Sequence, residues 1–239
     1  MPEIHSTNTL PNSNRDVYVI IPAYNEGAVL GDTVASLIPF GYSIVVVDDG
    51  SAVPASQFLL GRPVHYLRHL TNLGQGAALQ TGTEFALQQN AEIVVHFDAD
   101  GQHRPELIAR MIEPIRKQEC DVTLGSRFLD PEDRKLVPVE KQMVLKAGVL
   151  VTWLFSRVWL TDTHNGFRAL SRKAAGQISI TENGFAHATE ILEILRRTGL
   201  RYKEIPTTIT YTDYSRSKGQ SVWNSINIVF DLVARKVMR

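Results

Sequence analysis

Two aspartates stand two positions apart where an apolar run ends, within the stretch Ile93 to Gln102. The run, Ile93 to Phe97, is typical of a strand buried on both faces, and open α/β sheets bind their ligands at the carboxyl ends of such strands. Asp98 and Asp100, with the carbonyl of Gln102, offer the hard oxygen ligands that Mg²⁺ and Mn²⁺ prefer. Because these ions complete their coordination with water and phosphate, the pattern predicts a metal site for a phosphate ester. The alternative on this stretch alone is a solvated turn that ends a strand.

The elements that must position these carboxylates are predicted from the periodicity of apolar residues. Strands are predicted at residues 17–22, 43–47, 65–68, 93–97, 121–127 and 203–211, and helices at about 28–37, from the stretch 72–78 to about 88, and at 105–117. This alternation predicts an α/β fold, with a mostly parallel, Rossmann-like sheet flanked by helices. The strand that ends at Val47 also runs into acidic residues, Asp48 and Asp49.

Composition limits what such a site can serve. A chain of 239 residues with 44% hydrophobic residues can bury one sizeable core, so we expect a flexible polar tail at residues 1–16 and a single domain at 17–239. Lys and Arg balance Asp and Glu at 25 each, which argues against nucleic acid as a partner. The single cysteine, Cys120, permits no internal disulfide and fits a reducing cytosol.

Three other kinds of site fit these residues less well. The stretch Gly74 to Gly76 before a helix is typical of a dinucleotide site, but Leu79 stands where that fingerprint has its third glycine. An EF-hand would need a bidentate glutamate where Ala109 stands. A metal site that combines the carboxylates with His96 and His103 is the third alternative, and against it we expect His96 to be a buried, hydrogen-bonded histidine.

Six short motifs, in order, resemble those of the family 2 inverting glycosyltransferases, which have the GT-A fold. They are Ile21-Pro22-Ala23-Tyr24-Asn25-Glu26, Asp48-Asp49-Gly50-Ser51, Asn72-x-Gly74, Asp98-Ala99-Asp100-x-Gln102, Gly125-Ser126-Arg127 and Asp162-x-x-x-Gly166-Phe167-Arg168. Their order and spacing are most similar to the dolichol- or polyprenyl-phosphate sugar synthases, the group of dolichol-phosphate mannose synthase. Gln75 departs from the pattern, since the family commonly has a basic residue there. The Gln-x-x-Arg-Trp motif of processive synthases does not occur in the sequence, which counts against a chain-extending polymerase.

The resemblance implies a nucleotide-sugar donor, UDP- or GDP-linked, bound at the strand ends. The residues implied for donor binding are Pro22, Tyr24, Glu26, Val47, Asp49, Asp98, Ala99, Asp100, Gln102, Arg168 and Lys218. Asp98, Asp100 and Gln102 would hold Mg²⁺ or Mn²⁺, which stabilises charge on the departing diphosphate. Each residue also has an ordinary structural alternative: Tyr24 as a half-buried aromatic, for example, or Asp49 as a turn residue.

The acceptor decides the chemistry of the second half of the chain. A polyprenyl phosphate is already anionic, so cations need only position it; Arg127 and Lys141 are implied for this role, with Arg134 as a weaker candidate. The structural alternative for Arg127 is a salt bridge to a nearby carboxylate. With a sugar hydroxyl as acceptor a base must take the proton, and Asp162 is the candidate. The residues implied for catalysis are thus Asp100, Arg127 and Asp162. A non-catalytic nucleotide-sugar-binding module is the remaining alternative, and the intact carboxylates and arginine argue against it.

Two apolar segments bear on where such an enzyme works. Residues 142–160 carry Lys146 and Arg157 within an apolar run, which predicts either an interfacial helix or a core or subunit-interface helix, and not a transmembrane span. Residues 222–239 form an amphipathic helical stripe that ends in Arg and Lys residues. A peripheral protein is therefore expected at the cytoplasmic membrane face, held there by homo-oligomerisation, a small membrane-protein partner, or both.

Overall fold

The computed structural model of the protein describes residues 14–137, 142, 145–146, 148–149, 153–154, 157–163, 165–184 and 186–209. Several predicted features lie wholly or partly outside these residues: the N-terminal tail, much of the apolar segment 142–160, and the C-terminal amphipathic stripe. Two residues implied for the site, Lys141 and Lys218, also lie outside the described residues.

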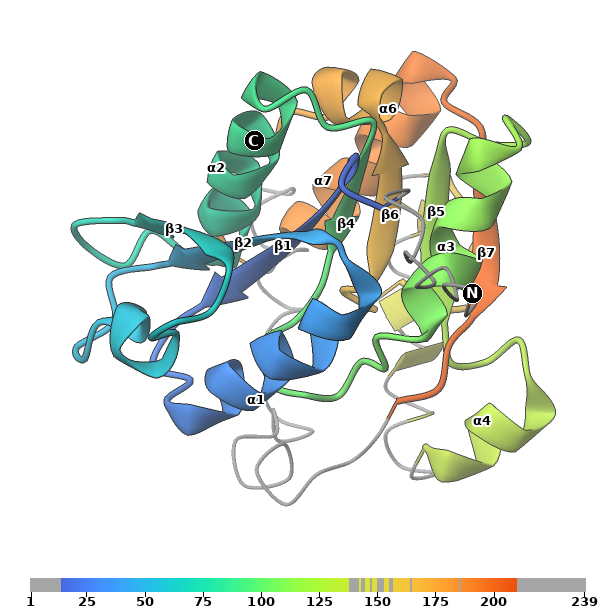
Figure 1. Cartoon of the computed structure of the whole chain (residues 1–239). Helices are drawn as coiled ribbons and strands as arrows, with labels where there is room; N and C mark the ends of the chain where they lie inside the picture. The colour runs from blue at the N-terminus through green and yellow to red at the C-terminus, as the bar shows by residue number, and fades with distance from the viewer. Residues whose placement is uncertain are drawn as a thin grey trace, which may run out of the picture.

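In the described part of the chain, seven strands form one sheet in the order β3-β2-β1-β4-β6-β5-β7 (Figure 1). The strands are β1 (Val17–Ala23), β2 (Ser43–Asp48), β3 (Val64–Arg68), β4 (Ile93–His96), β5 (Val122–Ser126), β6 (Arg168–Ser171) and β7 (Tyr202–Pro206). Neighbouring strands are parallel except for β6, which runs antiparallel to both β4 and β5. The carboxyl ends of the other six strands therefore lie at one edge of the sheet, together with the residues that precede β6.

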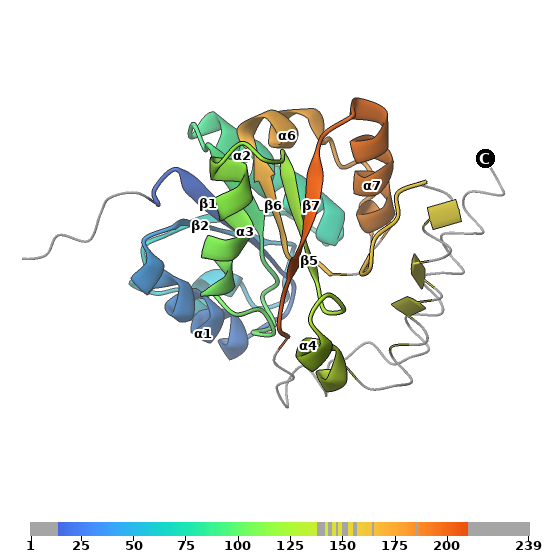
Figure 2. The same ribbon diagram turned by 90° about the vertical axis from the view of Figure 1, so that its right-hand side faces the viewer.

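Helices cover both faces of this sheet (Figure 2). Helices α1 (Ala28–Leu37) and α3 (Leu107–Arg116) pack on one face, and α2 (Gln75–Gln88), α6 (Arg172–Gln177) and α7 (His187–Thr198) pack on the other. The described parts of the connections contain the short helices η1 (Ile38–Phe40), η2 (Ala55–Phe58) and α4 (Pro131–Leu136). Within the described residues, no helix combines the length and the apolarity that crossing a membrane requires.

The central strand β1 shows why the sequence has continuous apolar runs. Successive side chains of a strand point to opposite faces. Val19 accordingly lies in the core cluster that contains α1 and α3, and Ile20 in the cluster that contains α2 and α7. Since both faces are covered, every residue of β1 is buried.

The predicted architecture, a mostly parallel sheet flanked by helices in a single α/β domain, is confirmed. Two strands differ from the prediction, and helices α4, α6 and α7 are not predicted from the sequence. The strand expected at 203–211 is β7, which spans Tyr202–Pro206; beyond it Ile209 forms only an isolated bridge with His103, and residues 210 and 211 lie outside the described residues. The sequence does not predict β6, since Arg168 reads as the end of a glycine turn; its four residues form a strand because β4 and β5 pair with it on both sides.

Candidate active site

Asp98 lies just beyond β4, at the edge where the carboxyl ends of the strands meet. Its Oδ1 accepts a hydrogen bond from Gln75 Nε2 at 3.1 Å, and its Oδ2 accepts one from His103 Nε2 at 3.0 Å. Burial by itself raises the pKa of Asp98, but the hydrogen bond and charge of His103 and the charge of Arg168 outweigh burial and lower the pKa. Asp98 is therefore an oriented anion at this edge.

Asp100 and Gln102 form the second half of the predicted metal-binding motif. Gln102 donates to Asp100 twice, from its backbone nitrogen to Oδ1 at 3.1 Å and from Nε2 to Oδ2 at 2.6 Å. Burial raises the pKa of Asp100, and the negative charges of Asp98 and Glu26 raise it further. Because two other carboxylates act on Asp100, negative charge is concentrated at this point of the edge.

A group of buried basic side chains lies behind these carboxylates. Arg168 pairs with His96 across strands β4 and β6. Burial lowers the pKa of Arg168 to about 10, while two carboxylates oppose the shift, so its guanidinium stays charged at neutral pH. Burial also lowers the pKa of His96 to about 3 and that of His187 to about 4, so both rings are neutral. His96 is 1% exposed and its Nε2 lies 3.1 Å from Thr83 Oγ1, which confirms the predicted buried, hydrogen-bonded histidine.

Gly166 leaves room for the carboxylate of Asp98. A Cβ atom on Gly166 would lie 2.6 Å from Asp98 Oδ2, which is closer than real side chains approach.

We expect Gly166→Ala to push the carboxylate of Asp98 aside with little loss of stability, because the displaced atoms form the end of a side chain. Binding of UDP or GDP with Mn²⁺, measured by calorimetry, should weaken about tenfold or more. Gly176→Ala, at a glycine with open space around it, is the control. An unchanged affinity of Gly166→Ala would mean that the position of Asp98 does not matter for binding.

Asp49 follows β2 at the same edge and is 3% exposed. Its Oδ1 accepts hydrogen bonds from His69 Nδ1 at 2.7 Å and from the backbone nitrogen of Leu73 at 2.9 Å. Its Oδ2 accepts one from the backbone nitrogen of Gly74 at 2.7 Å. Asp49 thus joins the end of β2 to the loop that follows β3.

The other described residues implied for donor binding differ in exposure. Tyr24 is 46% exposed, Glu26 and Gln102 are partly exposed, and Pro22, Val47, Ala99 and Arg168 are buried. The Val47 side chain is wholly enclosed in the apolar cluster on the α2 face, so a contact of this residue with a ligand would have to come from its backbone.

Arg127 and Asp162 form a buried ion pair beyond β5. Arg127 Nε donates to Asp162 Oδ2 at 2.6 Å, and Nη2 donates to Oδ1 at 2.7 Å. The backbone nitrogen of Arg127 adds a bond of 3.2 Å to Oδ2. The exposed fractions of Arg127 and Asp162 are 6% and 3%. The salt bridge to a nearby carboxylate, which the sequence offers as the alternative role of Arg127, is therefore present in the structure. Arg127 contacts both carboxylate oxygens of Asp162. Arg134 is exposed on α4.

Among the described residues, three side chains that the sequence does not assign to the site contact its carboxylates. Gln75, known from the sequence only as a departure from the family pattern, donates to Asp98. His103, considered only as a metal ligand, also donates to Asp98. His69, which the sequence does not single out, contacts Asp49. One signal for His69 was available: it directly follows β3, just as the predicted site residues follow other strands.

Gly74 and Gly76 admit a neighbouring loop of the protein itself. A Cβ atom at either position would collide with the backbone of Glu182 or Asn183. The backbone nitrogen of Gly76 donates to Asn183 O at 2.8 Å. The close backbone approach typical of glycines before a helix is therefore made here by the protein's own chain.

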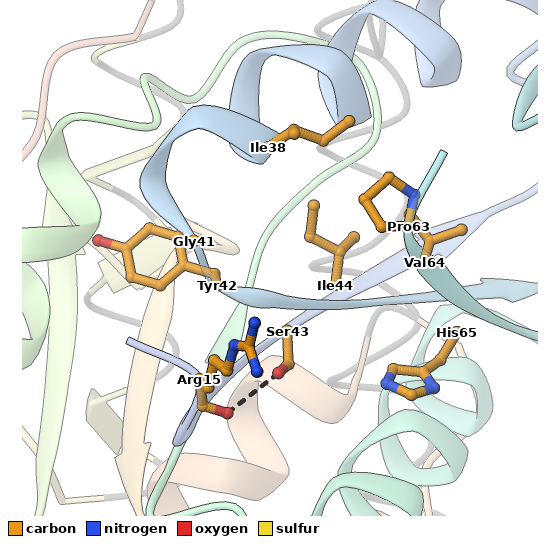
Figure 3. Close-up of a pocket in the computed structure, with 9 residues that line it drawn as sticks. All are labelled: Arg15, Ile38, Gly41, Tyr42, Ser43, Ile44, Pro63, Val64 and His65. Carbon is orange, nitrogen blue, oxygen red and sulfur yellow. Dashed lines mark hydrogen bonds between the residues drawn. The ribbon is translucent and has the colours of Figure 1, made fainter. Parts of the chain in front are cut away.

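A surface hollow of about 520 Å³ lies at the opposite, amino-terminal edge of the sheet, where β2 and β3 begin (Figure 3). It is lined by Arg15, Ile38, Gly41, Tyr42, Ser43, Ile44, Pro63, Val64 and His65. Ser43 Oγ donates to Arg15 O across its rim at 3.0 Å. None of its lining residues is a carboxylate, and it lies at the other end of the strands from Asp98, so it is not part of the candidate active site.

Comparisons with known proteins agree with this geometry. The family model described as glycosyl transferase family 2 matches residues 18–179. An uncharacterized protein of Methanocaldococcus jannaschii is 35% identical over 228 residues, which cover 94% of each chain. A UDP-N-acetylglucosamine–dolichyl-phosphate N-acetylglucosaminyltransferase of Methanococcus voltae is 31% identical and covers 92% of this chain and 96% of its own. An undecaprenyl-phosphate mannosyltransferase of Micrococcus luteus is 30% identical, with 84% and 86% covered.

The fold is also that of solved glycosyltransferases. A glucosyl-3-phosphoglycerate synthase from Mycobacterium tuberculosis matches with a TM-score of 0.66, over 94% of this chain and 81% of that one. At 17% sequence identity this likeness concerns the fold alone. The family match and the identity to the relatives confirm what the six motifs predict: the chain belongs to glycosyl transferase family 2 and is a nucleotide-sugar-dependent glycosyltransferase with the GT-A fold.

Proposed function

We propose that this enzyme transfers a sugar from a UDP- or GDP-linked donor to a polyprenyl phosphate, with inversion at the anomeric carbon. The observation that carries the proposal is that Asp98 and Asp100 lie just beyond β4 at the carboxyl edge of the sheet, where the negative charge of Glu26 also raises the pKa of Asp100. The buried pair of Arg127 and Asp162 lies at the same edge, on the far side of β6. Two relatives support the acceptor, since their names specify dolichyl phosphate and undecaprenyl phosphate.

The carboxylates at this edge fit a divalent cation. Their mutual influence raises the pKa of Asp100 beyond the effect of burial, and a cation would neutralise that concentrated charge. Within the described residues, no group of three or more His, Cys, Asp or Glu forms a metal site. Mg²⁺, however, is commonly held by one or two carboxylates together with water and substrate phosphates. Asp98 and Asp100 would hold the ion and Gln102 would orient Asp100; when bound, the ion offsets charge on the diphosphate leaving group.

The remaining donor contacts are assigned to the loops after β1 and β2. Tyr24 offers an exposed aromatic face to the base, Glu26 lies on the same loop, and Pro22 adds a contact from the end of β1. Asp49 is assigned to the base or ribose. Arg168 supplies positive charge behind Asp98, and Lys218 is proposed for the diphosphate on the basis of the family resemblance.

The ion pair favours a phosphate acceptor over a hydroxyl acceptor. A general base needs a carboxylate oxygen within reach of the hydroxyl proton, and both oxygens of Asp162 are engaged by Arg127. A phosphate nucleophile is already anionic and requires positioning only, which a guanidinium that is itself oriented by a carboxylate provides. In this proposal Asp162 positions Arg127, and Lys141 assists. A glycan hydroxyl with Asp162 as base remains the second candidate.

Exposed apolar side chains between β5 and β6 support contact with a membrane surface. Leu129, Leu154 and Trp159 are 40%, 50% and 62% exposed. Trp159 packs edge-on against Trp153, and the guanidinium of Arg157 lies 5.6 Å from the centre of the Trp153 ring. Aromatic and basic side chains together are typical of interfacial segments. We propose peripheral attachment at the cytoplasmic face, strengthened by self-association or by a small membrane protein.

An acceptor panel tests this function. The purified protein is incubated with UDP- and GDP-sugars and Mn²⁺, together with either polyprenyl phosphate in anionic liposomes or water-soluble glycans. We expect the protein to float with the liposomes and mass spectrometry to show sugar on the lipid phosphate. Transfer to a soluble glycan alone, by protein that stays away from liposomes, would reject the lipid acceptor and favour the second candidate.

A further inference from the structure

The carboxylate of Asp49 is held by three hydrogen bonds from one loop. His69 Nδ1 and the backbone nitrogen of Leu73 both donate to Oδ1, and the backbone nitrogen of Gly74 donates to Oδ2. All three donor–acceptor distances lie between 2.7 and 2.9 Å. Because Asp49 is also buried, its side chain has a single orientation that the protein itself sets.

His69 is in turn held by Thr81 on α2. His69 Nε2 lies 2.9 Å from Thr81 Oγ1, so both ring nitrogens of His69 have partners. An ionised carboxylate only accepts hydrogen bonds, so Nδ1 must carry the hydrogen that points at Asp49. Thr81, His69 and Asp49 therefore form a chain of hydrogen bonds that runs from α2 to the edge of the sheet and keeps His69 in the role of donor.

These contacts limit what Asp49 can still accept. A carboxylate oxygen has about two acceptor positions. His69 and Leu73 occupy both positions on Oδ1, and Gly74 occupies one on Oδ2. Within the described residues no further donor contacts this carboxylate, so one position remains, and it is on Oδ2.

The two candidate donor bases differ in the number of hydrogen-bond donors that they present side by side. Uracil has one ring N–H between two carbonyl oxygens, whereas guanine has a ring N–H beside an amino group and pairs best with both oxygens of a carboxylate. We infer that His69, oriented by Thr81, leaves Asp49 a single acceptor position and thereby selects uracil over guanine, so that the donor is a UDP-sugar. The inference rests on the proposed function, in which Asp49 faces the base. His69 acts through Asp49 and is a positioning residue.

Calorimetry of the full chain with UDP and with GDP, both in Mn²⁺, tests the selection of the base. UDP should bind about tenfold or more tightly than GDP, because one donor of guanine would be buried without a partner. Equal affinities, or tighter binding of GDP, would overturn the inference and leave the proposed transfer reaction standing. Failure of both nucleotides to bind would reject the proposed donor site, and the inference with it.

Substitutions of His69 test its role through the ratio of the two affinities. His69→Phe removes the Nδ1 donor and frees an acceptor position on Asp49 Oδ1. The ratio of the UDP affinity to the GDP affinity should therefore fall towards one. His69→Asn keeps an N–H group near that position and should retain the preference. A general loss of protein stability would weaken the binding of both nucleotides alike and leave the ratio of their affinities unchanged. A His69→Phe protein with the wild-type ratio would show that His69 does not select the base.

Two further variants complete the test. Thr81→Val is nearly isosteric and removes only the partner of His69 Nε2, so it should lower the preference even if His69→Phe does not fold. His65→Phe is the control, because His65 packs 5.1 Å from the Phe85 ring, away from Asp49. Its ratio should equal that of the wild type. An unchanged ratio in Thr81→Val would reject the part of the inference that assigns the orientation of His69 to Thr81.

Discussion

Asp98→Asn and Asp100→Asn are each expected to weaken the binding of UDP or GDP in Mn²⁺ by on the order of a hundredfold. Asparagine keeps the size of the side chain and removes the charge that would hold the cation. Without the ion, the carboxylates that remain at this edge, Glu26 among them, repel the phosphates. Chelation of the metal should therefore weaken nucleotide binding strongly in the wild type and very little in the two variants. Calorimetry with and without EDTA measures both effects.

Asp32→Asn is the matched control for this prediction. It makes the same change of charge at an exposed side chain on α1, whose charge is not among those that shift the pKa of Asp98 or Asp100, and it should bind like the wild type. Transfer activity should fall in Asp98→Asn and Asp100→Asn at least as far as affinity does. If both variants keep the wild-type dependence on metal, the assignment of the metal site is wrong.

Breaking the Arg127–Asp162 pair should have the largest effect on stability. Asp162→Ala removes the carboxylate that accepts two side-chain hydrogen bonds from a buried guanidinium. Losing one partner of a buried ion pair costs about 3–5 kcal/mol. The double variant Arg127→Met with Asp162→Leu should recover much of this free energy of unfolding, because neither charge is then buried alone. Urea denaturation of Arg127→Met, of Asp162→Leu and of the double variant gives the coupling between the two side chains.

An exposed pair provides the control for stability. Glu132→Gln breaks the ion pair with Lys135. The side chains of Glu132 and Lys135 are 78% and 70% exposed, so the change should alter the free energy of unfolding very little. If Asp162→Ala behaved like Glu132→Gln, the pair would not stabilise the fold.

The same pair separates the two acceptors when folded variants are assayed. With a lipid phosphate, turnover should fall mainly in Arg127→Gln, whereas Asp162→Asn keeps part of its activity because asparagine can still accept from Arg127. With a glycan hydroxyl, Asp162→Asn should lose on the order of a hundredfold or more, as the removal of a general base does. Wild-type turnover of Arg127→Gln on a lipid phosphate would exclude that residue from the acceptor site.

The sequence by itself determined the architecture and the edge of the sheet that carries the site. The apolar run of β1 is continuous because α1 and α2 cover opposite faces, so its burial leaves a pattern that can be recognised without coordinates. Helix α1 occupies the residues 28–37 that the periodicity predicts. Parallel strands end at a common edge, so residues as distant in sequence as Asp49 and Asp98 can be placed at one edge from their positions after strands.

Only the tertiary structure decided which side chains at that edge contact one another. Gln75 reaches Asp98 across 23 positions, and Arg127 reaches Asp162 across 35. No periodicity encodes such contacts, because they depend on how the loops run and on how closely the helices approach the sheet. The sequence leaves a salt bridge as one of two roles for Arg127 without choosing its partner, and folding supplies that partner.

The same distinction holds for β6 and for Gly166. The four residues of β6 have too little apolar pattern to predict a strand, and they become one because β4 and β5 offer hydrogen-bonding edges on both sides. Gly166 is part of a motif in the sequence, but its contact with Asp98 becomes apparent only in the folded chain. Burial of apolar neighbours imposes a period on the sequence, whereas a polar contact between two loops imposes none, so the first can be read from the residues and the second requires the packed structure.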